Sequence, residues 1–80
     1  MNDLQIEYFL AAARNMSFSR AAQELFVSQP AISRQILALE QELGCPLFER
    51  LNRGIMLTAN GEMFYDFFER YRGELFDLKL

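Results

Sequence analysis

Residues 27–35 read Val27-Ser28-Gln29-Pro30-Ala31-Ile32-Ser33-Arg34-Gln35. They predict the start of a helix, because a serine is a good N-cap and a proline is tolerated in the first helical turn. We expect this helix over about 28–43, ending at Gly44, with a buried face made of Ile32, Ile36, Leu39 and Leu43. The opposite face carries Gln29, Ser33 and Arg34, whose side chains can hydrogen-bond base edges or phosphates and are not needed for a core. This helix is therefore the candidate for recognition of nucleic acid.

Two shorter helical segments precede this stretch. An apolar stripe predicts a helix over about 3–14, capped by Asn2 or Asp3, and Asn15 suits the left-handed position that ends a helix. A second helix is expected to begin after Ser17. Two helices joined by a tight turn, the second longer and polar at its start, predict a helix-turn-helix.

The pattern changes after Gly44. Pro46 blocks continuation of the helix, and the tip Asn52-Arg53-Gly54 is flanked by segments that are long enough only for a two-stranded hairpin. An isolated hairpin is marginal in water, so this one must pack on the helices as a wing. Thr58 is a suitable N-cap for a last helix over about 59–79.

The last helix carries a heptad seam of apolar residues: Phe64, Phe68, Tyr71, Leu75 and Leu78. A helix this aromatic has too little of its own domain to bury against. We therefore expect the seam to form a homodimer, with folding back onto its own domain as the alternative. The chain as a whole is predicted to be mainly α. Residues 1–58 would form a winged helix-turn-helix with three helices and a short β-hairpin, and residues 59–80 a linker and dimerisation helix.

Composition limits the classes of function. Histidine is absent and Cys45 is the one cysteine, so the sequence offers no Cys–His pair, no metal ligand cluster and no internal disulfide. We expect no enzyme activity, no metal and no cofactor, and we interpret Cys45 as a small half-buried hydrophobe. The sequence lacks an apolar run of about 18 residues, and residues 1–3 lack the basic region of a secretory signal.

The net charge of −3 is unfavourable for a nucleic-acid binder. The arginines, however, are concentrated in the middle of the chain. Residues 14–58 carry a net charge of +1, and the segments on either side carry −2 each. The acidic total still predicts weak non-specific affinity, and with it a need for two linked copies.

Together these features resemble the N-terminal DNA-binding domain of LysR-type transcriptional regulators. The matching phrases cover nearly the whole chain without gaps: Ser17-Phe18-Ser19-Arg20-Ala21-Ala22, Val27-Ser28-Gln29-Pro30-Ala31-Ile32-Ser33-Arg34-Gln35-Ile36, Leu39-Glu40-Gln41-Glu42-Leu43-Gly44, Pro46-Leu47-Phe48-Glu49-Arg50 and Leu57-Thr58. The resemblance implies a third helix in the major groove of double-stranded operator DNA and a wing in the adjacent minor groove. It also implies a linker helix that pairs antiparallel with its twin.

The resemblance has consequences beyond this chain. Proteins of this family usually continue into an effector-binding domain, so a small-molecule effector would bind there, and we expect the chain to be a fragment rather than a naturally short relative. The family also implies a bacterial cytoplasmic protein that is associated with the nucleoid when bound to DNA.

The residues expected to contact DNA are Ser17, Ser19, Ser28, Gln29, Pro30, Ser33, Arg34, Arg50 and Arg53. Ser28 is first a cap, and one of Ser17 and Ser19 is expected to cap the second helix, where exposed N–H groups suit a phosphate. In the family Pro30 also presses against bases. Arg53 at the wing tip suits a minor groove.

Two alternatives remain open on the sequence. The chain is either a DNA-binding domain or a dimerising protein-interaction module without DNA binding, and titration with DNA at low salt separates these two. Within DNA binding, a winged-helix regulator of the multiple-antibiotic-resistance type is the other possibility. There the dimer usually uses both chain ends, so the position of the two-fold axis distinguishes it.

Overall fold

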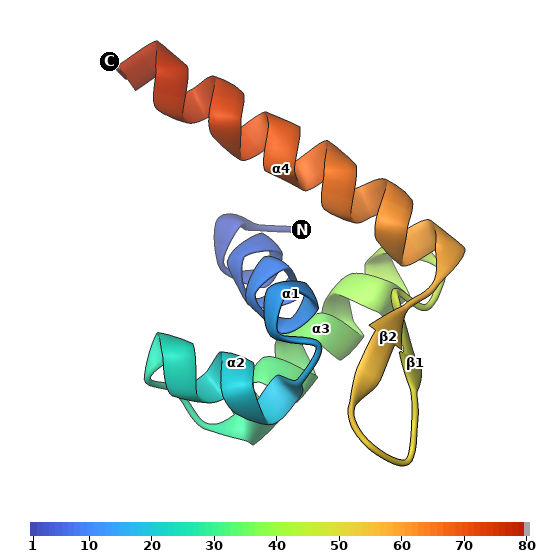
Figure 1. The fold of residues 1–80 in the computed structure, drawn as a ribbon. Coiled ribbons are helices and arrows are strands. Elements are labelled where there is room, and N and C mark those ends of the chain that lie inside the picture. The colour runs from blue at the N-terminus through green and yellow to red at the C-terminus, as the bar shows by residue number, and fades with distance from the viewer. Residues whose placement is uncertain (80) are drawn as a thin grey trace.

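The computed structural model describes the backbone of residues 1–79 and the side chains of residues 1–72. In chain order the elements are α1 (Asp3–Asn15), α2 (Phe18–Leu25), α3 (Gln29–Leu43), β1 (Phe48–Arg50), β2 (Ile55–Leu57) and α4 (Ala59–Lys79). The first three helices pack against one another, the β1–β2 hairpin stands beside them, and α4 runs across α1 (Figure 1). The predicted mainly α winged helix-turn-helix is confirmed.

Side-chain caps fix where the first three helices begin. Asn2 Oδ1 accepts a hydrogen bond from Gln5 N at 2.8 Å, and Gln5 Oε1 accepts one from Asn2 N at 3.3 Å, which completes a capping box. Ser17 Oγ and Ser28 Oγ each accept a bond from the backbone N–H three residues later, at 3.1 and 3.2 Å. The cap of α1 is thus Asn2, and the predicted starts of α2 and α3 are confirmed.

Each of these helices ends at a residue whose backbone adopts the left-handed conformation. These residues are Met16 after α1, Phe26 after α2 and Gly44 after α3. The prediction that Asn15 takes this position is wrong by one residue. Asn15 is the last residue of α1, and its Nδ2 donates a hydrogen bond to Ala11 O at 2.8 Å. Since a left-handed backbone is costly for bulky side chains, the tight turns at Met16 (φ 49°) and Phe26 (φ 58°) depend on the packing of the adjoining helices.

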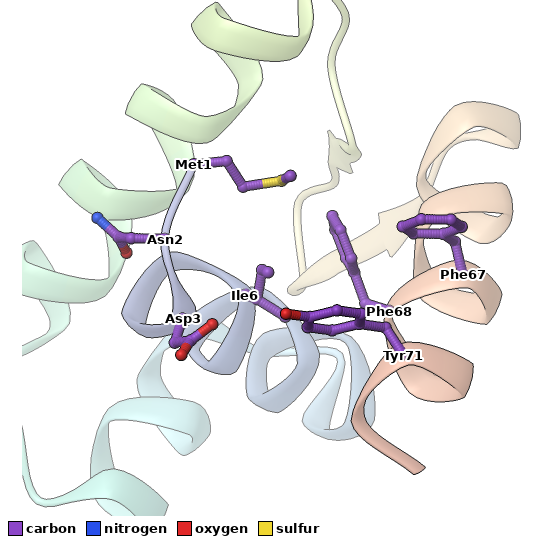
Figure 2. Close-up of a pocket in the computed structure, with 7 residues that line it drawn as sticks. All are labelled: Met1, Asn2, Asp3, Ile6, Phe67, Phe68 and Tyr71. Carbon is purple, nitrogen blue, oxygen red and sulfur yellow. The ribbon is translucent and has the colours of Figure 1, made fainter. Parts of the chain in front are cut away.

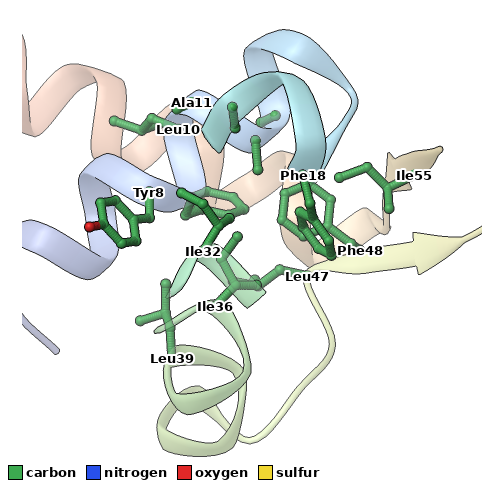
Figure 3. Packing of buried hydrophobic residues seen from close by; sticks show 14 of the residues in the cluster. Tyr8, Leu10, Ala11, Phe18, Ile32, Ile36, Leu39, Leu47, Phe48 and Ile55 are labelled. Atoms are coloured by element: carbon green, nitrogen blue, oxygen red, sulfur yellow. The ribbon is translucent and has the colours of Figure 1, made fainter. Parts of the chain in front are cut away.

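A single core joins the helices to the hairpin (Figure 3). Its largest fully buried side chains are Phe9, Leu10, Ile32, Ile36, Leu39, Leu47 and Phe68. Phe9 is central: its ring centroid lies 5.4 Å from that of Phe48 in β1 and 5.8 Å from that of Phe68 in α4. The rings are inclined to one another, as aromatic pairs prefer. One α1 side chain therefore holds both the wing and α4.

The wing, residues 48–57, is an antiparallel hairpin in which Phe48 pairs with Leu57 at the base. A hydrogen bond from Leu51 N to Gly54 O, 3.0 Å long, closes the tip. Gly54 has φ +89°, and a Cβ there would lie 3.0 Å from Met16 O. Glycine thus allows the tip to turn and to lie against the α1–α2 junction.

The first turn of α4 packs against the segment that precedes β1. Thr58 Oγ1 accepts a hydrogen bond from Gly61 N at 2.9 Å and donates one to Pro46 O at 2.8 Å, which confirms Thr58 as the cap. Gly61 is buried, and a Cβ at this position would overlap Leu47 O. Only glycine lets the helix approach this closely.

Part of the predicted heptad seam faces the chain's own domain. Phe68 is only 1% exposed, and Phe64 packs partly buried against the same core. The expectation that Phe68 is available to a second copy needs correction, because the Phe9 ring covers it. Leu75 and Leu78 lie outside the described side chains. The division of roles between residues 1–58 and 59–80 stays a prediction, although the two parts share this core.

Candidate nucleic-acid interface

The outer face of α3 carries the polar residues predicted to recognise bases. Gln29, Pro30 and Arg34 are exposed, and Ser33 is half-buried at the edge of the face. The 3.6-residue helical repeat places Pro30 and Arg34 away from the side chains that α3 buries, whereas Gln29 is exposed because it is the first residue of the helix. The core thus uses one side of α3, and the other side is exposed.

A shallow depression of about 350 Å³ brings together the start of α2, the start of α3 and the wing. Its lining consists of Ser17, Phe18, Ser19, Gln29, Arg50, Leu51, Gly54 and Ile55. Four of the predicted contact residues are thus gathered at one place, namely Ser17, Ser19, Gln29 and Arg50. The others lie outside this lining: Ser28, Pro30, Ser33, Arg34 and Arg53.

The start of α2 has the chemistry of a phosphate site. N–H groups in the first turn of a helix lack intrahelical acceptors and carry partial positive charge. Ser17 is the cap and Ser19 is exposed beside it. The Arg50 guanidinium carbon lies 4.9 Å from the centre of the Phe18 ring, so a cation–π contact holds this cation at the same place. Hydroxyl, N–H and guanidinium groups are the usual partners of phosphate oxygens.

The arginines of this surface are not neutralised by acids. Among the side chains that the structure describes, Arg34, Arg50 and Arg53 form no ion pair, whereas Arg14 pairs with Glu24. Arg53 is exposed at the tip of the wing. Helix α3 and the wing together carry three arginines and three glutamates, so their net charge of zero is less unfavourable for an anionic ligand than the −3 of the whole chain.

The Arg14–Glu24 pair ties the end of α1 to the end of α2. Hydrogen bonds to the Glu24 carboxylate from Arg14 and, at 3.1 Å, from Asn15 hold the pKa of this carboxyl below its ordinary value of 4.5. The contact helps to fix α2 relative to α1.

Glu40 is a positioning residue that the sequence interpretation missed. Its Oε2 accepts hydrogen bonds from Leu47 N at 2.7 Å and Phe48 N at 3.3 Å, so it fixes the segment between α3 and the wing. The signal was present, because Glu40 follows Ile36 by four residues and so falls on the buried face of α3.

Helical spacing does not predict two further features, the close approach of Gly61 to Leu47 and the contact between Arg50 and Phe18. Gly61 is an unfavourable residue for a helix, which hinted at a close approach but not at its partner. The contact between Arg50 and Phe18 joins residues that are far apart in the sequence.

A second exposed surface lies on α4. Its outer stripe, Met63, Phe67 and Tyr71, is spaced by four residues, and these side chains are 56%, 60% and 41% exposed. An adjoining groove of about 290 Å³ runs between α1 and α4, with Met1 and Ile6 on one side and Phe68 and Tyr71 on the other (Figure 2). This combination of stripe and groove is an apolar surface of the kind that proteins bury against a partner.

Membrane-spanning and metal-binding features are absent from the part of the chain that the structure describes. No helix there is long and apolar enough to cross a membrane, and no group of three histidine, cysteine or acidic residues is placed to hold a metal ion.

A polar helix face beside a hairpin wing, on a three-helix core, defines a winged helix-turn-helix domain. The family model described as "Bacterial regulatory helix-turn-helix protein, lysR family" matches residues 4–62. The chain therefore belongs to the LysR family, and the multiple-antibiotic-resistance type is set aside.

Individual relatives agree with this assignment. The chain is 54% identical over 61 residues to the HTH-type transcriptional regulator BudR of Klebsiella aerogenes, a match that covers 76% of this chain and 43% of that regulator. The chain thus spans less than half the length of this curated relative.

Solved structures extend the likeness to almost the whole chain. The DNA-binding domain of BenM in complex with catB site 1 DNA is 36% identical, with a TM-score of 0.93, over 98% of this chain and 88% of that one. The DNA-binding domain of CbnR in complex with DNA is 43% identical, with a TM-score of 0.89, over 99% of this chain and 94% of that one.

Proposed function

We propose that this chain is the DNA-binding domain of a LysR-type transcriptional regulator and binds double-stranded operator DNA sequence-specifically. The observation that carries the proposal is the uncovered polar face of α3, which begins beside the start of α2 and an arginine-tipped wing. The likeness to two domains solved in complex with DNA supports it.

The contacts divide by chemistry. On the outer face of α3, Arg34 suits guanine and Gln29 suits adenine in the major groove, because each can form two parallel hydrogen bonds to that base. Ser33 and Pro30 add contacts on the same face. The wing tip presents Arg53 to the adjacent minor groove, where a narrow groove attracts a guanidinium.

The remaining contacts position the domain on the DNA backbone. Ser17, Ser19 and Arg50 bind one phosphate at the start of α2, and Ser28 binds another at the start of α3. Phosphate contacts of this kind fix register and orientation but carry no sequence information themselves.

The functional unit is a homodimer that forms through α4. The surface available to a second copy is the outer stripe, Met63, Phe67 and Tyr71, together with the groove beside it. Phe68 lies in the core and supports this surface from beneath. Two linked domains compensate for the weak binding of one acidic domain, since the second binding event becomes intramolecular.

We propose no catalysis, metal or cofactor for this chain. A small-molecule effector would bind to a separate domain of the regulator, and the protein would act in the bacterial cytoplasm on nucleoid DNA. Regulation of transcription follows from occupancy of the operator.

Selection of bound sequences from a random double-stranded DNA library tests the proposal. The expected product is an inverted repeat of two half-sites at constant spacing, because a two-fold dimer binds a two-fold site. Absence of enrichment, together with no binding in a low-salt titration, contradicts the proposal. That result would favour a dimerising protein-interaction module, which the acidic charge and the apolar surface of α4 also fit.

A further inference from the structure

The outer face of α3 includes one large apolar side chain that the proposed contacts do not use. Leu37 is 50% exposed, whereas its neighbours Ile36 and Leu39 are fully buried on the opposite side of the helix. Leu37 therefore contributes little to the core, and its role must lie on the exposed face.

The position of Leu37 on α3 places it beside the proposed base contacts. It follows Ser33 by four residues and Arg34 by three, so the three side chains share one face of the helix. The axial distance from Ser33 to Leu37 is about 6 Å. An α-helix in a major groove that brings Ser33 and Arg34 to base edges thus brings Leu37 toward neighbouring base pairs.

The chemistry of the groove limits what a leucine can recognise there. Base edges in the major groove present hydrogen-bond donors and acceptors, which a leucine cannot satisfy, and one apolar group, the C5-methyl of thymine. The phosphates beside the groove are charged and offer a leucine no favourable contact.

We propose that Leu37 contacts the methyl group of a thymine in each half-site and is a specificity-determining residue of this domain. The inference rests on the proposed function. It adds an apolar selection for thymine to the hydrogen-bonded contacts of Gln29, Ser33 and Arg34.

Deoxyuridine substitution tests this contact, because it removes the methyl group and keeps base pairing. Each thymine of the selected half-site is replaced in turn, and the Kd is measured for the unmodified chain and for Leu37→Ala. One position should weaken the unmodified chain about three- to fivefold, the effect of one buried methyl group, and should not weaken Leu37→Ala further.

Two variants serve as controls. Leu37→Met keeps an apolar side chain and should retain sensitivity to the same deoxyuridine. Leu4→Ala removes a similarly exposed leucine from α1 and should behave like the unmodified chain.

Three results overturn the inference while the proposed function stands. They are a half-site without thymine, a lack of sensitivity to every deoxyuridine, and equal sensitivity of the unmodified chain and Leu37→Ala at every position. Failure to bind any DNA overturns the inference and the proposed function together.

Discussion

Helices α3 and α4 are built alike toward the core and differently toward the outside. Each begins at a hydroxyl cap, Ser28 or Thr58, and each buries one face in the same core. Their outer faces are Gln29, Ser33 and Arg34 on α3, against Met63, Phe67 and Tyr71 on α4. A polar face suits a hydrated, charged ligand such as DNA, whereas a row of large apolar side chains is best explained by a protein partner.

The two helices also differ in how they are attached. Helix α3 packs against both α1 and α2, whereas α4 packs against α1 and β2. Two close contacts attach α4: Gly61 in its first turn approaches Leu47, and Phe68 near its middle is buried against Phe9. The position of α4, and so the geometry of any dimer, is decided by these residues.

The largest expected effect comes from breaking the attachment of α4. Gly61→Ala should lower the free energy of unfolding by about 3 kcal/mol, because the added methyl overlaps Leu47 O and the backbone must move. Gly44→Ala is the matched control, since a Cβ at Gly44 meets nothing within 4 Å. The control should lose only about 1 kcal/mol, the cost of a left-handed alanine. Urea unfolding measures both, and equal losses would contradict the close approach.

Introducing a charged side chain into the outer stripe of α4 tests whether this stripe forms the dimer interface. Phe67→Asp should raise the dimer dissociation constant about 30-fold or more, the effect of losing a central interface residue. Phe67→Leu keeps an apolar side chain and should retain most of the dimer. Sedimentation velocity measures the assembly, and circular dichroism checks the fold. If Phe67→Asp leaves the dimer intact, the outer stripe is not part of the interface. Phe68→Asp does not test the interface, because Phe68 is buried and the variant would disrupt the core.

The wing belongs, with the outer face of α3, to the surface that we propose to bind DNA. Arg53→Ala should reduce the slope of log affinity against log salt by about one unit for each wing in the complex, because a cation in the minor groove neutralises nearby phosphate charge and the variant lacks it. Arg72→Ala, an exposed arginine on α4, should leave the slope unchanged. Titrations at several salt concentrations give the slope, and an unaltered value for Arg53→Ala would mean that the wing tip does not touch DNA.

The smallest expected effect concerns the brace between α1 and α2. Because the pKa of Glu24 is lower in the folded chain, its contribution to stability is present above the unfolded pKa and disappears as the pH falls through the folded value. Glu24→Gln should thus be slightly less stable than the unmodified chain at pH 7 and equally stable near pH 2. Urea unfolding at both pH values checks this, and a difference that is independent of pH would contradict the pKa shift.

Local signals in the sequence predicted most of the fold. The starts of α2, α3 and α4 follow from hydroxyl caps at Ser17, Ser28 and Thr58, and the end of α3 follows from Gly44. The end of α1 was misplaced by one residue. Asn15 tolerates the left-handed conformation, but its side chain instead bonds within α1 and to Glu24.

The orientation of α4 was beyond local signals. This helix is apolar on two sides, so heptad spacing alone does not tell which side faces its own domain. The answer depends on Phe9 and Leu47, which are distant in sequence from Phe68 and Gly61. The exposure of Gln29 and Arg34 was easier to predict, because the polar face of an amphipathic helix lies opposite the face that packs on the core. Their contact with DNA stays a prediction.

The central claim is that the outer face of α3 recognises bases, and Arg34→Ala tests it most directly. Affinity is measured for the selected DNA and for a scrambled duplex at the same salt concentration, with Arg34→Lys as the control that keeps the charge but not the two parallel hydrogen bonds. Arg34→Ala should weaken specific binding by about 1–3 kcal/mol and change binding to the scrambled duplex much less. Unchanged affinity for the selected DNA would contradict the assignment of this face.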